Sequence, residues 1–372
     1  MHIRHVEAIG LAGATPPGGW TRELEPDDAV HTLVLVHTDE GLTGVGAVSS
    51  TLALVRAALE LLTPICLGQD PLQPGPLAET LRQNTFWLGH GGAVSHAISG
   101  IDIALWDLAG QALGQPIGRL LGGTYRRRVR PYASVLMEEP AALADRLTQL
   151  REYGFRAFKI GWGPFGRRDS TTDERLVRAA REAVGPSATL AVDAGGSDAF
   201  WPNALSWAVR TSHMLAEFDV AWFEEPLRPD AITDHAELRR RSAVPIAGGE
   251  VLARRQAFQP YLDAGSFDIV QPDVTKVGGL DEACRIGWSA EDRGVRLIPH
   301  GWNTAVGLAA DLHLASALPG TDLVEYCPGA AYIDELIDQP WNLDQDGMLA
   351  VPDRPGLGID LNPEALERYA VR

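Results

Sequence analysis

The sequence is poor in cysteine and lacks long apolar runs. Its three cysteines, Cys66, Cys284 and Cys327, are odd in number, widely spaced and outside any metal-binding pattern. We interpret them as free thiols, which favours a reducing cytoplasm as the location of the chain. No apolar stretch approaches the roughly 20 residues that a membrane-spanning helix needs. The N-terminal segment MHIRHVEAIG also lacks the apolar core of a signal peptide. We therefore expect neither membrane insertion nor export.

Positive charge is also scarce. The chain has 32 Lys and Arg against 49 Asp and Glu, a net charge of −17. This excess disfavours nucleic acids and anionic membranes as partners. It would also repel an anionic substrate, unless a bound divalent cation reversed the sign locally. With 45% hydrophobic residues the composition is otherwise that of a globular protein, and 372 residues suffice for a barrel and a smaller domain.

The first third of the chain has the pattern of a mixed α+β domain. Residues 31–48 alternate as two strands joined by a turn. Apolar residues recur at helical spacing over 53–65 and 93–114. We expect residues 1–125 to form an α+β domain, to which the tail 351–372 returns.

Residues 126–350 have a different pattern, in which short apolar runs alternate with helix-like segments. Eight strands alternating with helices predict an α/β fold whose parallel sheet closes into a barrel. A doubly wound open sheet is the alternative, but no Gly-rich phosphate-binding turn follows any of the runs. The runs span 130–136, 155–160, 189–194, 220–225, 245–250, 268–273, 295–300 and 322–327.

Seven of these runs carry a functional side chain at or near their carboxyl end. Because the carboxyl ends of parallel barrel strands meet at one face, we expect the seven side chains to converge on one mouth. A polar side chain at a single strand end is most simply the start of a loop. A purely structural barrel, however, has no reason to place seven such side chains at one end. They are Lys159, Asp193, Glu224, Glu250, Asp273, His300 and Glu325.

Three of the seven are carboxylates on consecutive strands. Asp193, Glu224 and Glu250 would repel one another strongly in one pocket unless a cation lay between them. Oxygen ligands without cysteine or histidine favour Mg²⁺, with Mn²⁺ as an alternative, over Zn²⁺. The simpler explanation is that they pair with arginines, and Arg228 is available to one of them. Glu225 competes with Glu224 as a ligand, because adjacent strand residues face opposite sides.

The other four side chains are candidates for proton transfer and anion stabilisation. Asp273 and His300 come from neighbouring runs, and a carboxylate bonded to one ring nitrogen would fix the imidazole tautomer and raise its basicity. The pair is therefore a candidate general base. Lys159 could donate to an oxyanion that develops near the metal, or it could extend from the strand end into solvent. Glu325 could donate a hydrogen bond if its neighbours keep it protonated; otherwise it is a further acid.

Residues in the loops at the catalytic face are candidates for substrate contact. Trp162 follows the second run, and Trp302 and Asn303 follow the seventh. Arg167 and Arg168 lie in the same loop as Trp162 and are more simply surface residues.

Taken in order, the motifs of the chain resemble those of the enolase superfamily, and within it the mandelate racemase-like subgroup. The resemblance implies an N-terminal α+β capping domain, completed by the C-terminal tail, over a modified TIM (β/α) barrel. Residues 13–28 are rich in Gly and Pro, which predicts a mobile loop and fits a specificity loop of the cap. The motifs are AISGIDIALWDLAGQALGQPIGRLLGG, FKIG, VDAGG, FEEP, GGE, PDVTKVGG, PHGWNT and PGLGID.

The same resemblance implies roles for the residues at the strand ends. The three carboxylates would bind Mg²⁺, and the pair Asp273 and His300 would abstract the proton α to a carboxylate. Glu325 would hydrogen-bond the resulting enediolate. The resemblance also suggests a homo-oligomer.

Two positions depart from the pattern of the subgroup. Gly161 stands where many members have a second lysine, the base on the opposite face of the substrate, and Gly195 stands where many have an asparagine. With His300 as the only evident strong base, β-elimination is favoured over racemisation. We therefore predict a lyase of carbohydrate catabolism, an acid-sugar dehydratase that forms a 2-keto-3-deoxy acid. The alternatives are a racemase or epimerase of the same family, a zinc hydrolase and a non-catalytic sugar-acid-binding barrel.

Overall fold

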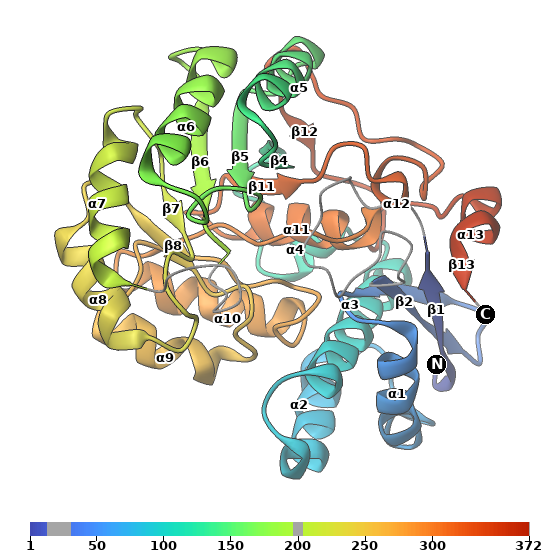
Figure 1. The fold of residues 1–372 in the computed structure, drawn as a ribbon. Helices are drawn as coiled ribbons and strands as arrows, with labels where there is room; N and C mark the ends of the chain where they lie inside the picture. The colour runs from blue at the N-terminus through green and yellow to red at the C-terminus, as the bar shows by residue number, and fades with distance from the viewer. Residues whose placement is uncertain (13–30, 196–203, 372) are drawn as a thin grey trace.

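The computed structural model describes residues 1–12, 31–195 and 204–371. These residues form a barrel and a smaller α+β cap, which lie side by side in Figure 1. The stretch 13–28, for which a mobile loop was predicted, lies outside the described residues. None of the helices that are described is long and apolar enough to cross a membrane.

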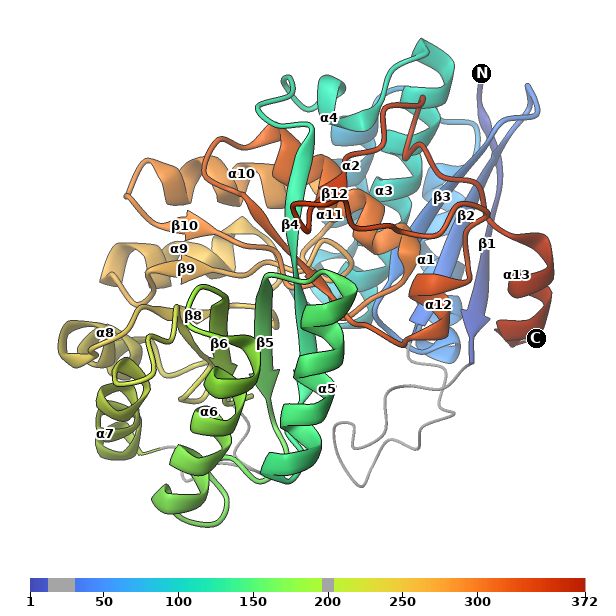
Figure 2. The ribbon, with the colours of Figure 1, turned by 90° about the horizontal axis from the view of Figure 1, so that it is seen from above.

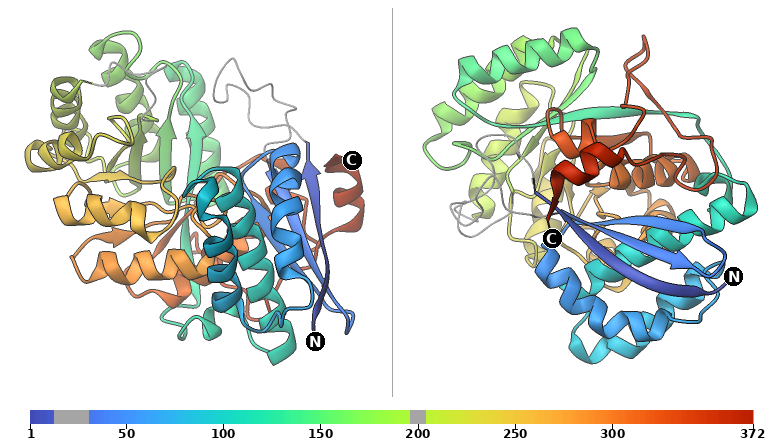
Figure 3. Two further views of the ribbon diagram at one scale, coloured as in Figure 1. Left: turned by 90° about the horizontal axis from the view of Figure 1, so that it is seen from below. Right: turned by 90° about the vertical axis from the view of Figure 1, so that its right-hand side faces the viewer.

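The cap is a four-stranded antiparallel sheet with helices on one face. Its strands are ordered β13-β1-β2-β3, so the C-terminal end of the chain completes a sheet that the N-terminus begins. Figure 2 shows α13 beside β1, and Figure 3 shows α1 and α3 along the sheet, with α2 packed on α3. The strands are β1 (Ile3–Leu11), β2 (His31–Thr38), β3 (Thr43–Val48) and β13 (Ala370–Val371), and the helices are α1 (Leu52–Cys66), α2 (Pro74–Thr85), the 3₁₀ turn η1 (Phe86–Leu88), α3 (Ala93–Leu113) and, in the tail, α13 (Pro363–Tyr369).

The barrel is a parallel sheet of eight strands in the order β10-β9-β8-β7-β6-β5-β4-β11. Among the described residues β10 does not pair with β11, so the ring of backbone hydrogen bonds stays open, as in a modified barrel. A short strand, β12 (Leu349–Ala350), pairs antiparallel with β4. The eight strands are β4 (Arg128–Leu136), β5 (Ala157–Gly161), β6 (Thr189–Asp193), β7 (Phe223–Glu224), β8 (Ile246–Gly248), β9 (Ile269–Val270), β10 (Arg296–Leu297) and β11 (Leu323–Tyr326).

Helices surround these strands, as Figure 1 shows. They are α4 (Ile117–Leu120), α5 (Pro140–Tyr153), α6 (Ser170–Val184), α7 (Leu205–Ala216), α8 (Ile232–Arg241), α9 (Arg255–Ala264), α10 (Leu280–Glu291), α11 (Ala305–Ala317) and α12 (Ala331–Asp334). Several strands are shorter than the apolar runs that predicted them. Glu250, Asp273 and His300 therefore lie just beyond the ends of β8, β9 and β10, although an isolated parallel bridge still pairs Asp273 with His300.

The barrel interior is closed by one layer of side chains, to which each of the eight predicted runs contributes. Tyr132 and Trp222 are its largest members, and their rings pack edge to face with centroids 5.5 Å apart. Such a filled interior leaves no pore, so the open space of the barrel is confined to its mouths. The layer consists of Tyr132, Ala157, Ala191, Trp222, Ala247, Ile269, Ile298 and Leu323.

Helix α3 joins the cap to the barrel through buried acceptors. The Ser99 hydroxyl accepts a hydrogen bond from the Gly278 amide at 2.8 Å, and the Asp102 carboxylate accepts one from the Leu280 amide at 2.7 Å. Gly279 has φ +91°, and a Cβ there would overlap the Asp102 carboxylate. The cap therefore holds the turn that begins at Asp273 through hydrogen bonds to its backbone.

Asp107 is a second tie between the two parts. Its carboxylate accepts hydrogen bonds from the amides of Val45 at 3.0 Å and Leu357 at 2.8 Å, and from the Gln111 side chain at 2.9 Å. One side chain thus links β3, α3 and the returning tail. Burial raises the pKa of Asp107 to about 6, because the ionised form is poorly solvated there.

We expect Asp107→Ala to lower the free energy of unfolding by about 3 kcal/mol, because it leaves buried amides without acceptors. Urea unfolding measures this. Asp145→Ala, on the exposed side of α5, is the matched control and should change the free energy by less than about 0.5 kcal/mol. Equal effects of the two substitutions would contradict the role given to Asp107.

Candidate metal and catalytic site

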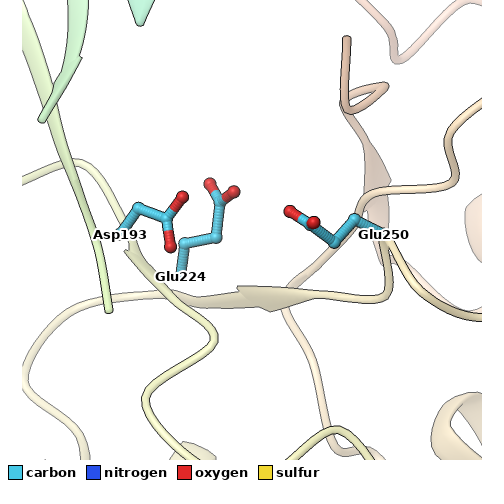
Figure 4. A group of neighbouring side chains, drawn as sticks. All are labelled: Asp193, Glu224 and Glu250. Carbon is cyan, nitrogen blue, oxygen red and sulfur yellow. The ribbon is translucent and has the colours of Figure 1, made fainter. Parts of the chain in front are cut away.

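Three carboxylates meet at the mouth of the barrel. Asp193 and Glu224 end neighbouring strands in register, and Glu250 lies just after β8. One oxygen atom from each lies within 4.8 Å of the others. Figure 4 shows Asp193 and Glu224 side by side, with the carboxylate of Glu250 facing them. Asp193 and Glu224 are buried, and Glu250 is partly exposed.

The barrel interior fixes the orientation of Glu224. The indole N–H of Trp222 and the amide of Gln271 both donate to its Oε2, at 2.9 and 2.8 Å. Asp193 is fixed more locally, because its Oδ1 accepts from the Gly195 amide at 2.7 Å. Neighbouring hydrogen-bond donors therefore hold one oxygen of Glu224 and one oxygen of Asp193.

Lys159 lies among these acids rather than extending into solvent. Its side chain is only 3% exposed, and Nζ lies 2.5 Å from Glu224 Oε1 and 3.3 Å from Asp193 Oδ2. Arg228, the arginine considered as a partner, instead pairs with Asp230 at 3.6 Å. The acids of the cluster therefore do have a cationic neighbour, but it is a lysine.

Lys159 does not balance the cluster. Burial, followed by repulsion from Glu224, raises the pKa of Asp193 well above its ordinary value, even though Lys159 acts in the opposite direction. A divalent cation would remove this repulsion. The donors are hard carboxylate oxygens without sulfur, which suits Mg²⁺ or Mn²⁺. The residues present therefore fit such an ion.

Glu225 is buried close to the cluster but lies outside the group of three. Its Oε1 accepts from the Gly249 amide at 3.3 Å, and its backbone has φ +42°. Burial, and then the charge of Glu250, raise the pKa of Glu225 well above its usual range. Among the described residues Glu224, rather than Glu225, completes the possible metal group.

His300 and Asp273 form a buried pair on adjacent strand ends. His300 Nδ1 lies 2.8 Å from Asp273 Oδ2, and the Asp273 Oδ1 accepts from the amide and hydroxyl of Thr275 at 2.7 and 2.6 Å. The other ring nitrogen, Nε2, lies 3.2 Å from Glu250 Oε2. His300 therefore lies between Asp273 and the carboxylate cluster.

The pKa values of this pair are shifted in opposite directions. Burial alone would raise the pKa of Asp273, but Lys276 and His300 bring it well below its usual range. Burial alone would lower the pKa of His300, but Glu250, Glu325 and the bond to Asp273 raise it above 6.5. The pair is therefore an ionised carboxylate beside an imidazole of increased basicity.

Lys276 belongs to the same site, although no role was predicted for it. Its Nζ lies 3.4 Å from Asp273 Oδ2 and 3.8 Å from Glu250 Oε1. The position of Lys276 in PDVTKVGG could have indicated this, because a turn after Asp273 returns the lysine toward that carboxylate.

Glu325 is held as an acceptor. Its Oε2 accepts from the Gly301 amide at 2.8 Å, and its Oε1 lies 3.0 Å from Lys159 Nζ. Burial would raise the pKa of Glu325, but Lys159, His300 and these hydrogen bonds lower it to about 2. Glu325 is thus ionised in this arrangement, and it must gain a proton before it can donate a hydrogen bond.

The predicted substrate contacts divide into two groups. Trp162 and Trp302 line the cavity that also borders Lys159, Glu250 and the other strand-end groups. Asn303 is not part of that lining; it is 1% exposed and its Nδ2 lies 3.4 Å from Asp311 Oδ2. Trp162 and Trp302 therefore lie at the site, whereas the side-chain amide of Asn303 points toward α11.

Gly161 ends β5 beside the carboxylate cluster, where it offers no proton-transfer group. A Cβ at this position would lie 2.9 Å from the Cβ of Asp193, closer than such atoms approach. The next residue, Trp162, has φ +61°, and its ring covers Gly195. A lysine in place of Gly161 would thus require Asp193 to move.

Comparison with known families agrees with this geometry. The family description "Mandelate racemase / muconate lactonizing enzyme, N-terminal domain" matches residues 26–122, and "Enolase C-terminal domain-like" matches residues 142–365. The chain belongs to the enolase superfamily. The predicted capping domain and modified barrel are thereby confirmed.

Enolase-superfamily relatives cover almost the whole chain. It is 32% identical to a D-galactarolactone cycloisomerase of Agrobacterium fabrum over 92% of both proteins. It is 33% identical to a D-galactonate dehydratase of Xanthomonas euvesicatoria, covering 90% of this chain and 89% of that protein. A crystal structure of a racemase from Streptomyces coelicolor with bound magnesium superposes with a TM-score of 0.87 at 31% identity, covering 99% and 100% of the two chains.

We expect Mg²⁺ at 100 times its dissociation constant to raise the free energy of unfolding by about 2.7 kcal/mol. Asp193→Asn or Glu250→Gln should abolish this gain, because each removes a charged ligand. Chemical unfolding with and without the metal measures the effect. Glu174→Gln, on α6 with its side chain 43% exposed, is the control and should keep the full gain. Loss of the gain in the control, or its survival in both site variants, would contradict a metal site here.

Proposed function

We propose that this enolase-superfamily enzyme is a cytoplasmic acid-sugar dehydratase that acts on a small sugar acid as a homo-oligomer. The observation that carries the proposal is the placement of His300. One ring nitrogen is bonded to Asp273, and the other faces the carboxylates of Glu250 and Glu325 at 3.2 and 3.9 Å. A base this close to a metal-binding group is well placed to take a proton from the carbon next to a metal-bound carboxylate.

Asp193, Glu224 and Glu250 would hold the ion, Mg²⁺ by preference and Mn²⁺ as an alternative. When bound, it would chelate the substrate carboxylate and stabilise charge that develops on it. It would also explain how a protein with a net charge of −17 admits an anion. The Lys159 ammonium, buried beside the same space, would donate to the developing oxyanion.

His300 would act first as base and then as acid. In the first step Nε2 takes the proton from the α-carbon, and Asp273 stabilises the imidazolium that forms. The electron pair left on the α-carbon then expels hydroxide from the β-carbon, and the imidazolium returns a proton to it, so that water departs. The enol that remains tautomerises to a 2-keto-3-deoxy acid, which balances the elimination.

Glu325 would respond to charge on the substrate. Its low pKa depends largely on Lys159, which lies 3.0 Å away. An enediolate would add negative charge near Glu325, and the Lys159 ammonium would then interact with the enediolate as well as with Glu325. Both effects favour the protonated form of Glu325. The protonated side chain then donates to the enediolate.

Two neighbouring reactions differ from this one in testable ways. Racemisation or epimerisation needs a proton donor on the second face of the substrate, and Gly161 supplies none. Cycloisomerisation is the second alternative, because the chain is 32% identical to a D-galactarolactone cycloisomerase. Its product has the same mass as the substrate, whereas the dehydration product is lighter by one water.

We expect Mg²⁺-loaded protein to form 2-keto acids from at least one member of a panel of mono- and diacid sugars. Mass spectrometry of the products separates loss of water from isomerisation. A panel that gives proton exchange at the α-carbon without loss of water would favour the racemase or epimerase instead.

We expect His300→Asn to reduce turnover of that substrate by roughly 10²–10⁴-fold, because it removes the general base. His213→Asn, on the exposed side of α7, is the control and should keep full turnover. Full turnover of His300→Asn would exclude His300 as the base.

We expect kcat/KM to rise with pH through one inflection, because His300 must be neutral to accept the proton and the bond to Asp273 raises its pKa. Activity should be lost on the acid side, where the imidazole is already protonated. The pH profile of kcat/KM at saturating Mg²⁺ measures this, and a profile that is flat from pH 5 to 9 would contradict it.

A further inference from the structure

Glu224, the middle carboxylate of the three, has two hydrogen-bond donors on one of its oxygens. Its Oε2 accepts from the indole N–H of Trp222 at 2.9 Å and from the side-chain amide of Gln271 at 2.8 Å. A carboxylate oxygen has about two lone-pair sites, so both sites on Oε2 are used. The other oxygen, Oε1, lies 2.5 Å from Lys159 Nζ and keeps one site. Glu224 therefore has one oxygen to offer a metal ion.

The alternation of side chains along the strands brings these groups together. Trp222 and Ile269 belong to the layer that fills the barrel interior. Glu224 and Gln271 each lie two residues further along the chain, so their side chains face the same interior, one step nearer to the mouth. The indole of Trp222 thus reaches Glu224 from the filled layer, and Gln271 reaches it from the end of β9.

Both donors are fixed by packing and act on Glu224 alone. Trp222 and Gln271 are each 1% exposed, the Trp222 ring packs on Tyr132, and the Gln271 backbone amide donates to Gly248 at 3.0 Å. Neither donor lines the cavity at the mouth. Among the described residues Gln271 Oε1 has no hydrogen-bond partner, so the contact with Glu224 is the one hydrogen bond of that side chain.

The other two carboxylates are held less completely. Asp193 Oδ1 accepts one hydrogen bond, from the Gly195 amide at 2.7 Å, and Oδ2 lies 3.3 Å from Lys159 Nζ. Glu250 is partly exposed and lies 3.2 Å from His300 Nε2 through one of its oxygens. Within the described part of the chain, both carboxylates keep a lone-pair site on each oxygen. Glu224 is therefore the carboxylate whose binding mode is set by its hydrogen bonds.

The number of oxygens that a carboxylate offers affects which ion it favours. Ca²⁺ takes about six to eight oxygen ligands and often binds a carboxylate through both oxygens. Mg²⁺ is smaller, prefers an octahedron of about six ligands, and keeps several of its waters. Restricting a carboxylate to one oxygen therefore removes a ligand that Ca²⁺ would use and Mg²⁺ would not.

We propose that Trp222 and Gln271 are positioning residues that make the site select Mg²⁺ over Ca²⁺, because they leave Glu224 one free oxygen. The inference rests on the proposed function, since it assumes that Asp193, Glu224 and Glu250 bind the ion that the reaction uses. It goes further by assigning the choice of ion to two residues that are not themselves ligands.

The test is calorimetric titration of Mg²⁺ and, separately, of Ca²⁺ into the metal-free protein without substrate. Gln271→Met keeps the length of the side chain and removes its donor, which frees a lone-pair site on Oε2 of Glu224. Loss of a hydrogen bond to a ligand weakens the binding of either ion, but Ca²⁺ gains an oxygen in return. We expect the ratio of the two dissociation constants to shift by about tenfold in favour of Ca²⁺. Trp222→Phe, which keeps an aromatic ring in the interior layer, should shift the ratio in the same direction.

Two similar substitutions away from the site provide matched controls. Gln259→Met removes a glutamine of α9 that donates to the Asp263 carboxylate at 2.6 Å. Trp106→Phe removes an indole N–H of α3 that has no partner among the described residues. Both should leave the ratio of the dissociation constants unchanged. Thermal melts check that each variant keeps its fold.

The remaining outcomes separate the inference from the function on which it rests. Equal weakening of Mg²⁺ and Ca²⁺ binding in Gln271→Met and Trp222→Phe would give these residues a structural role only, and would overturn the inference while the proposed function stands. A shift of the ratio in favour of Mg²⁺ would overturn it as well. Failure of the unsubstituted protein to bind either ion would overturn the metal site, and with it the proposed function and the inference together.

Discussion

Repulsion among buried carboxylates governs the mouth of this barrel. Six acids gather there, and the described cations among them are two lysines, one beside Glu224 and one beside Asp273. Charges in a medium of low polarity interact strongly, so the cluster is stable only with protons or a further cation in it. Burial and this repulsion raise the pKa of Asp193 and Glu225, whereas Lys276 and His300 lower the pKa of Asp273. The six are Asp193, Glu224, Glu225, Glu250, Asp273 and Glu325.

The rest of the barrel holds this cluster in place. Trp222 belongs to the interior layer, and its indole N–H donates to Glu224, so the packing of the core sets the direction of a possible metal ligand. Gln271, between β9 and Asp273, donates to the same oxygen. Rigid strands thereby supply precise positions, while the loops beyond them supply chemical variety.

The cap contributes to the same site from outside the barrel. Ser99 and Asp102 of α3 bind the amides of Gly278 and Leu280, and the turn held in this way carries Lys276. Placement of the cap and geometry of the Asp273 pair are therefore linked. His31 of the cap also packs edge to face on Tyr332 of the barrel, so ring packing as well as hydrogen bonds joins the two parts.

The sequence by itself determined the architecture and which strand ends face the same mouth. Alternating runs and helices predict a barrel because their periods are local, and strand ends at regular spacing predict which side chains share a mouth. Neither strand β1 nor helix α2 was predicted. Strands β7 to β10 are shorter than their runs, because backbone pairing depends on neighbours that the local sequence does not specify.

Only the tertiary structure decided which groups touch. It placed Glu224 rather than Glu225 in the carboxylate group, turned Asn303 toward Asp311, and brought Lys159 among three acids. It also added Lys276 to the site and set His31 against Tyr332, from opposite ends of the chain. The physical reason is that such contacts depend on strand register, side-chain rotamers and the packing of the cap, and these arise from long-range contacts rather than from local sequence.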